Sequence, residues 1–496
     1  MQPGVGRWRR RAAMMVAFLF ALGVGLGFAQ TAQAATRTWT GLGLTTNWSD
    51  SANWLGNVVP GSADVAMFDL ISSKNAAIGS PISVAGISMS ANYTGTITQS
   101  PGIAVTIGAS GFTQAGGTFA GGTAPITVNG PFALLAGSFI STSGKLSVSG
   151  DFTATGGSFD PWIGTTSFGG GAAALTVTTG DVFNNLTFAG GTKTLAAGTS
   201  LTAGGALSLT AGSLNGSGSL AAQDSISQAP TFAGGSASLL LNGSGPQTLS
   251  GAATLSAGNL PPLVINKPSG TLSLAGTLRT ANNWTYTAGT LDPGSSTLIF
   301  AGGTISAPGM SFYDVTTNGG TTTLGDAMTV AHDLTVSAGT LTTSASNHSL
   351  MVGGSLTIMG TFRGNGSAVA VQADFTTNGT FVPGTSTVTL DGSAGQMAGG
   401  TAAATPVFNL VVDDPLGVAL AANMTITGRL TLTTGQLNVG AHLLTIRNAI
   451  AGTPTNLVAD ASSSLTVGGA GAGISVPSSV LQLGDLTLDN PSGLAI

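Results

Sequence analysis

The sequence predicts an all-β protein, and three observations lead to that fold class: its composition, the alternation of apolar and hydroxyl residues, and a short recurring motif. Of the 496 residues only 6% are charged and 77 are Gly, while 42% are hydrophobic. The sequence contains no Glu, so all 18 acidic residues are Asp. Helix surfaces usually carry Glu, Lys and Arg, whereas Thr, Val and Ile favour strands and Gly favours turns. The composition therefore disfavours both a helical protein and a charged, disordered one.

The first 34 residues predict a signal peptide. Four arginines within residues 7–11 precede an apolar stretch over residues 12–28, and Ala32-Gln33-Ala34 matches an A-x-A cleavage site. Cleavage leaves nine basic residues against 18 Asp, a net charge of −9 that argues against nucleic acid as a partner. No later apolar run is long enough to predict a membrane-spanning helix. The chain has no Cys, so an exported protein of this kind must rely on packing or repetition for its stability.

A three-residue motif, Gly then Ser or Thr then Phe or Leu, recurs at nearly constant spacing. Its copies lie 20 and 20 residues apart in one cluster, and 21 and 19 residues apart in another. The clusters comprise residues 117–119, 137–139 and 157–159, and residues 339–341, 360–362 and 379–381. Longer segments repeat as well, since LTVSAGTL (334–341) resembles LTLTTGQL (430–437) and LSLTAGSL (207–214). This period predicts one structural unit of about 20 residues.

Each unit has the pattern of strands joined by glycine turns. In Leu430-Thr431-Leu432-Thr433 the apolar and hydroxyl side chains alternate, which places them on opposite faces of a strand. A parallel β-solenoid, expected to be right-handed, would bury the apolar face between coils and align outward Thr and Ser in ladders. A β-propeller is the alternative, but its blades repeat at about 40–50 residues. Residues 71–496 are therefore predicted to form the solenoid, and the sequence stops within a repeat segment.

Residues 35–70 differ from the repeats and are predicted to cap one end of the solenoid. Trp39, Trp48 and Trp54 lie within sixteen residues of one another, although the whole chain has six Trp. The terminal coil of a solenoid exposes strand edges and core side chains, and large aromatic rings can cover them. The alternative is an exposed aromatic platform that stacks on sugars. We favour the cap.

This Trp-rich segment resembles the region that follows the signal peptide in many large bacterial surface β-solenoid proteins. The shared pattern in TWTGLGLTTNWSDSANWLGNVVPGSADVAMFD (38–69) is TW-x-G, NW, ANW-x-G, P-G-x-x-D and a terminal F-D. The matching residues are Trp39, Gly41, Asn47, Trp48, Asn53, Trp54, Gly56, Pro60, Gly61, Asp64 and Phe68. Proteins with this segment include autotransporter passengers and related β-strand-repeat adhesins. The resemblance implies a cell-surface β-solenoid and says little about its ligand.

The sequence offers little that predicts catalysis, and we assign no catalytic, cofactor-binding or metal-binding residues. The histidines, His332, His348 and His442, have spacings that match no metal-ligand motif, and His332 with Asp333 is expected to face outward from a strand. Asp413-Asp414 is the only adjacent acidic pair, and its position before Pro predicts a turn. Asp160 and Asp292 precede Pro in two equivalent repeat segments. Such equivalence indicates a structural role.

Together these features predict an exported, non-enzymatic structural or adhesive protein at a bacterial surface, associated with the outer membrane. Surface glycans or host and matrix proteins are the expected partners, without nucleic acid and without a cofactor. A polysaccharide-active β-helix enzyme, a lyase or hydrolase, is the first alternative, and charged residues that line one groove would support it. A carbohydrate-binding module built on the N-terminal Trp cluster is the second, and exposed coplanar rings would support it.

Overall fold

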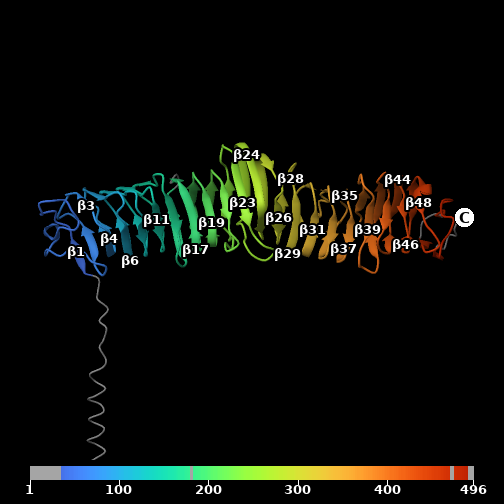
Figure 1. Ribbon diagram of the computed structural model, residues 1–496, viewed down its shortest axis with the longest axis horizontal. Helices are drawn as coiled ribbons and strands as arrows, with labels where there is room; N and C mark the ends of the chain where they lie inside the picture. Colours follow the sequence, from blue (N-terminus) through green and yellow to red (C-terminus); the bar gives the residue numbers. More distant parts are fainter. Residues whose placement is uncertain (1–34, 179–181, 470–473, 490–496) are drawn as a thin grey trace, which may run out of the picture.

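A computed structural model describes residues 35–178, 182–469 and 474–489, so the predicted signal peptide lies outside the described residues. The chain forms a long rod with β1 (Thr36–Thr38) at one end and β50 (Asp485–Asp489) near the other (Figure 1). Parallel strands stack about 20 residues apart and form about 21 turns. The predicted parallel β-solenoid is confirmed. At about 4.8 Å per turn, the rod is roughly 100 Å long.

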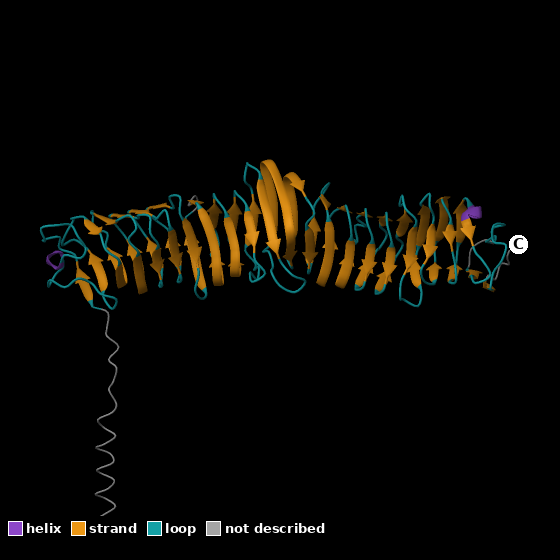
Figure 2. Cartoon of the chain, in the orientation of Figure 1, coloured by secondary structure: helices purple, strands orange, loops and turns teal. Residues whose placement is uncertain are grey.

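Strands line the rod along its length (Figure 2), and they belong to four sheets. The largest contains 32 strands, and the three smaller ones contain five, eight and five. The first small sheet comprises β3 (Ala76–Ile78), β5 (Thr96–Gln99), β7 (Thr118–Ala120), β10 (Ser138–Ile140) and β13 (Ser158–Asp160). The second comprises β28 (Ser311–Phe312), β30 (Met328–Val330), β32 (Leu350–Val352), β35 (Ala368–Val371), β38 (Thr387–Leu390), β41 (Asn409–Asp413), β44 (Arg429–Thr434) and β47 (Ala449–Gly452). The third comprises β40 (Thr405–Val407), β43 (Met424–Ile426), β46 (Leu443–Ile446), β49 (Ser464–Gly468) and β50.

The large sheet supplies the strands that carry the surface described below. Those strands are β4 (Ile82–Met89), β6 (Val105–Gln114), β8 (Ile126–Val128), β11 (Lys145–Val148), β14 (Thr165–Phe168), β17 (Asn185–Leu195), β19 (Leu207–Gly216), β21 (Ile226–Gln228) and β23 (Gln247–Ala252). Other strands of the same sheet that are named below are β2 (Val65–Phe68), β9 (Phe132–Leu134), β12 (Phe152–Ala154), β24 (Leu263–Thr280), β25 (Trp284–Asp292), β29 (Asp314–Leu324), β31 (Leu334–Thr342), β34 (Thr361–Arg363) and β37 (Thr380–Val382). Helical structure in the described residues is limited to two 3-10 turns, η1 (Ser51–Asn53) and η2 (Pro454–Asn456). None of the described helices is long and apolar enough to cross a membrane.

The register of the strands follows the repeated motif. In β7, β10 and β13 the Phe of each motif copy pairs with the Phe of the next, so Phe119, Phe139 and Phe159 form one row. Their rings stack with centroids 5.1 and 5.8 Å apart. In β31, β34 and β37, Leu341 pairs with Phe362, which pairs with Phe381. The motif spacing in the sequence is therefore the length of one coil at these positions.

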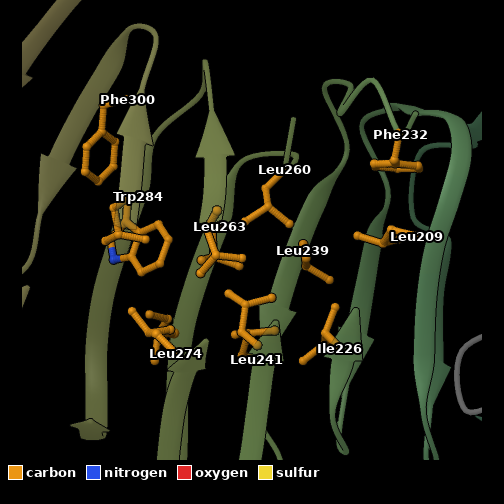
Figure 3. Close-up of a cluster of buried hydrophobic side chains, with 14 of the residues drawn as sticks. Leu209, Ile226, Phe232, Leu239, Leu241, Leu260, Leu263, Leu274, Trp284 and Phe300 are labelled. Atoms are coloured by element: carbon orange, nitrogen blue, oxygen red, sulfur yellow. The ribbon is translucent and has the colours of Figure 1, made fainter. Parts of the chain in front are cut away.

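The core is a continuous column of such rows inside the coil. A second row, Phe112, Phe132 and Phe152, stacks beside the first with centroids 5.1 and 4.8 Å apart. Further along the rod Leu, Ile and Trp side chains from successive coils fill the same interior (Figure 3). Burial of apolar area against the coils above and below makes the main favourable contribution to the free energy of folding.

Glycine turns allow adjacent coils to approach closely. Gly339, the first residue of one motif copy, has a φ of +71°, a conformation that side-chain-bearing residues rarely adopt. A Cβ at this position would lie 1.4 Å from the carbonyl oxygen of Gly319 in the preceding coil. The motif requires Gly here for both its backbone angle and its lack of a side chain.

Two lysines are buried at the edge of the core, where sequence alone would place them in solvent. Lys193 Nζ donates to the carbonyl oxygens of Gly169 and Gly171, and Lys267 Nζ donates to those of Gly243 and Gly245 at 2.8 and 2.9 Å. Each lysine is 1% exposed, and burial lowers the pKa of both ammonium groups. Lys267 lies in β24, the long strand that projects beyond the rod near its middle (Figure 1).

Candidate functional site

The Trp cluster at the N-terminal end is buried. Trp39, Trp48 and Trp54 are at most 2% exposed, and they pack around Phe68 of β2 with centroid distances of 5.7 to 5.8 Å. Trp39 and Trp48 each meet Trp54 edge to face, 5.1 and 4.9 Å away. Tyr93 from the next coil closes the cluster against Phe68. These rings are neither exposed nor coplanar, so they do not offer a sugar-stacking surface.

Polar side chains of the same segment hold the chain over the rings. Asp50 caps η1 by accepting a hydrogen bond from the backbone N–H of Ala52. The buried Asn53 amide donates to the carbonyl oxygens of Thr45 and Asn47, both at 2.9 Å, and Trp54 Nε1 donates to the carbonyl of Trp48 at 2.7 Å. The Asn and Trp residues of the motif therefore build one folded loop across the end of the rod.

A different tryptophan presents its ring to solvent. Trp162 is 44% exposed, and its neighbour Ile163 is 67% exposed. Trp162 lies in the turn after β13 with a φ of +49°, and its backbone N–H donates to Asp160 Oδ1. Sequence reasoning did not single out Trp162. An isolated Trp within a repeat gives no signal that separates core from surface.

The Asp residues before Pro act as turn acceptors. Asp160 accepts from the backbone of Trp162, Asp292 from Gly294, and Asp414 from Leu416. Asp413 instead accepts a hydrogen bond from the Thr434 hydroxyl, one coil later. Turn geometry therefore explains Asp160, Asp292 and Asp414, whereas Asp413 links two coils.

One open groove crosses β38, β41 and β44 and has a volume of about 410 Å³. Its described lining residues include one charged side chain, Arg429, among Thr, Asn, Val, Phe and Gly. A lining of this kind lacks the pair of carboxylates that glycoside hydrolysis requires. The groove therefore gives the hydrolase form of the polysaccharide-enzyme alternative no support.

His332 is the histidine with acidic neighbours. It lies in the bend before β31, not within a strand as expected, and it is exposed. Its Nδ1 atom is 2.7 Å from Asp314 Oδ1 and 3.6 Å from Asp333 Oδ2. The hydrogen bond to Asp314 and the charge of Asp333 raise the pKa of the imidazole. The sequence did not reveal the contact with Asp314, because that residue lies one coil earlier and only the coil length aligns the two.

A regular surface feature of the rod is a row of hydroxyl side chains, which we call the hydroxyl row. Its members lie on nine strands in consecutive register, from β4 to β23, and all of them except the buried Ser167 are partly or fully exposed. They are Ser83, Thr106, Thr127, Ser147, Ser167, Thr187, Ser208, Ser227 and Ser250. The row confirms the predicted ladders of Thr and Ser, and eight of its nine coils present a short polar side chain to solvent.

Comparisons with protein-family models, with curated proteins and with solved structures found no match to this chain.

Proposed function

We propose that this protein is an exported, non-enzymatic structural or adhesive rod at a bacterial surface, associated with the outer membrane. The observation that carries the proposal is the hydroxyl row, which gives the rod a long and regular line of hydroxyl groups over nine coils. Export is supported by the sequence of residues 1–34 and by the resemblance of residues 38–69 to the N-terminal segment of surface β-solenoid proteins.

The regular spacing of the row suits a repetitive partner. Successive hydroxyls lie about 4.8 Å apart along the rod, and the exposed members can each form a weak hydrogen bond with a partner. Many weak contacts on one rigid scaffold give an avidity that no single contact supplies, because later contacts form at high effective concentration. Surface glycans and matrix proteins are partners of this kind, since both present closely spaced polar groups.

Immobilised glycans and matrix proteins test the adhesive function. The full chain should bind a subset of them, and Thr127→Lys with Thr187→Lys, which puts two long cations into the row, should weaken binding at least about tenfold, or roughly 1.4 kcal/mol. Thr425→Lys with Thr466→Lys is the matched control, because these outward Thr residues lie in β43 and β49 of another sheet. Equal binding by the two variants would contradict a role for the row.

A second assay separates adhesion from catalysis. The chain is incubated with polysaccharides, and new reducing ends or unsaturated sugar ends are measured. We expect neither to form, and turnover of any polysaccharide would replace this proposal with the enzyme alternative. Antibody labelling of intact cells checks the surface location.

A further inference from the structure

Two consecutive coils bring one imidazole and two carboxylates together on the surface of the rod. Asp314 is the first residue of β29, and His332 and Asp333 lie in the bend that leads into β31. Because Val315 pairs with Leu334, Asp314 and Asp333 occupy equivalent places in successive coils. The three ligand atoms that these side chains can offer all lie within 4.8 Å of one another. Among the described residues this is the one such group.

We propose that Asp314, His332 and Asp333 form a binding site for a divalent transition-metal ion such as Zn²⁺, which would link the two coils. This inference is independent of the proposed adhesive function.

The spacing of the ligand atoms fits such an ion. Zn²⁺ binds His nitrogen and carboxylate oxygen at about 2.0–2.2 Å, so neighbouring ligands around a tetrahedral ion lie roughly 3.3 to 3.6 Å apart. His332 Nδ1 is 2.7 Å from Asp314 Oδ1 and 3.6 Å from Asp333 Oδ2. The atoms of His332 and Asp333 already have this separation, whereas those of His332 and Asp314 must move apart by roughly 0.6 Å, a shift that exposed side chains can make.

The ligands are already held in place by neighbouring groups. The backbone N–H of Asp333 donates to Asp314 Oδ1 at 3.2 Å, and that of Ser355 in the next coil donates to Asp333 Oδ1 at 2.8 Å. The Tyr313 ring stacks on the His332 imidazole with a centroid distance of 4.9 Å and an interplanar angle of 11°. Such outer contacts orient metal ligands and reduce the entropy lost on binding.

The donor set selects the class of ion. One imidazole nitrogen with two carboxylates suits Zn²⁺, Ni²⁺ or Cu²⁺, whereas Ca²⁺ prefers six to eight oxygen ligands and Mg²⁺ an octahedron of oxygens. The side chains of Asp314, His332 and Asp333 are 30%, 50% and 48% exposed. Water can therefore complete the coordination sphere, and an ion can enter without any rearrangement of the coil.

Isothermal titration of the full chain with Zn²⁺ tests the site. We expect one saturable site per chain, and we expect His332→Gln and Asp314→Asn each to weaken it at least about tenfold, or roughly 1.4 kcal/mol. His348→Gln and His442→Gln are the matched controls, because neither histidine belongs to the group, and they should leave the affinity within about twofold. Circular dichroism checks that every variant keeps its strands.

The electron paramagnetic resonance spectrum of the Cu²⁺-loaded chain identifies the ligands directly. Coupling to a single imidazole nitrogen is expected, and it should disappear in His332→Gln alone. The proposal is overturned if the wild type shows no saturable Zn²⁺ binding below about 1 mM, or if His332→Gln binds Zn²⁺ as the wild type does. Displacement of Zn²⁺ by an equal concentration of Ca²⁺ would also overturn it.

Discussion

Trp54→Ala should open the N-terminal end of the rod without unfolding its middle. The Trp54 indole is 1% exposed, meets Trp39 and Trp48 edge to face, and donates its Nε1 hydrogen to the Trp48 carbonyl at 2.7 Å. Its removal leaves a cavity beside Phe68 and an unpaired carbonyl in the buried loop. The terminal coil has a neighbour on one side only among the described residues, where β1 pairs with β2.

The magnitude follows from these contacts. Truncation of a buried Trp to Ala costs about 3–5 kcal/mol, and loss of a hydrogen bond adds about 1 kcal/mol. A local cost of about 5 kcal/mol corresponds to between three and four powers of ten in the equilibrium constant for opening. Because stability in a solenoid is the sum of nearest-neighbour terms, the loss should stay within the first coils.

Hydrogen exchange followed by mass spectrometry measures this effect coil by coil. In Trp54→Ala, amides of β1 and β2 should exchange faster by up to about three to four powers of ten. Amides of β31 should keep their wild-type rates. Unchanged exchange in β2 would refute the cap, and equal acceleration in β31 would refute the local unfolding.

A pair of conservative variants separates the hydrogen bond from the packing. Trp54→Phe loses the bond to the Trp48 carbonyl, whereas Trp48 Nε1 has no hydrogen-bond partner, so Trp48→Phe loses none. We therefore expect Trp54→Phe to be the more destabilising by about 1 kcal/mol. Iodide quenching provides an independent check, because Trp162 should supply most of the quenched fluorescence and Trp162→Phe should remove it.

Three further predictions concern the coils. Gly339→Ala should lower the free energy of unfolding by more than about 3 kcal/mol. Gly309 also has a positive φ, but the space around its Cβ position is open, so Gly309→Ala should lower that free energy by only about 1–2 kcal/mol. Equal urea midpoints for the two variants would contradict the close approach of Gly319 to Gly339. Lys267→Met removes the ammonium donor from the carbonyl oxygens of Gly243 and Gly245 and should cost about 3 kcal/mol. The exposed Lys145→Met should cost less than about 0.5 kcal/mol in the same denaturation assay. Burial, together with the charge of Asp413, raises the pKa of Asp391, so the folded state binds this proton more tightly than the unfolded state. The contribution of Asp391 to the free energy of unfolding is therefore present below the ordinary pKa of 3.8 and is lost as the pH rises through the raised pKa. Urea midpoints measured across this pH range should show the loss in the wild type and not in Asp391→Asn.

The fold could be predicted because its main signal is local and repeated. The Phe of each Gly-Thr/Ser-Phe motif packs against the equivalent Phe one coil away. Phe119, Phe139 and Phe159 are 20 residues apart, and they pair in the register that this spacing predicts. Hydroxyl residues alternate with these core positions, so their outward direction followed from the strand period alone.

The choice between the two interpretations of the Trp residues needed the structure. An aromatic residue in a polar loop can lie over the core or in solvent, and the spacing of Trp39, Trp48 and Trp54 is compatible with both. Their burial depends on Phe68 and Tyr93, which later coils bring against the loop. For Trp162 the turn geometry directs the ring outward.

By itself the sequence determined the coil length, the residues that face inward, and a surface almost free of charge, because each of these depends on a local period. Only the tertiary structure decided which polar side chains meet across coils. Coil lengths vary, so that Gln247 aligns with Leu272 while Thr297 aligns with Asp314. The contact between Asp314 and His332 depends on the number of residues in the coil that separates them. The burial of Lys267 depends in the same way on the length of the coil before it. No single segment of the sequence contains that information.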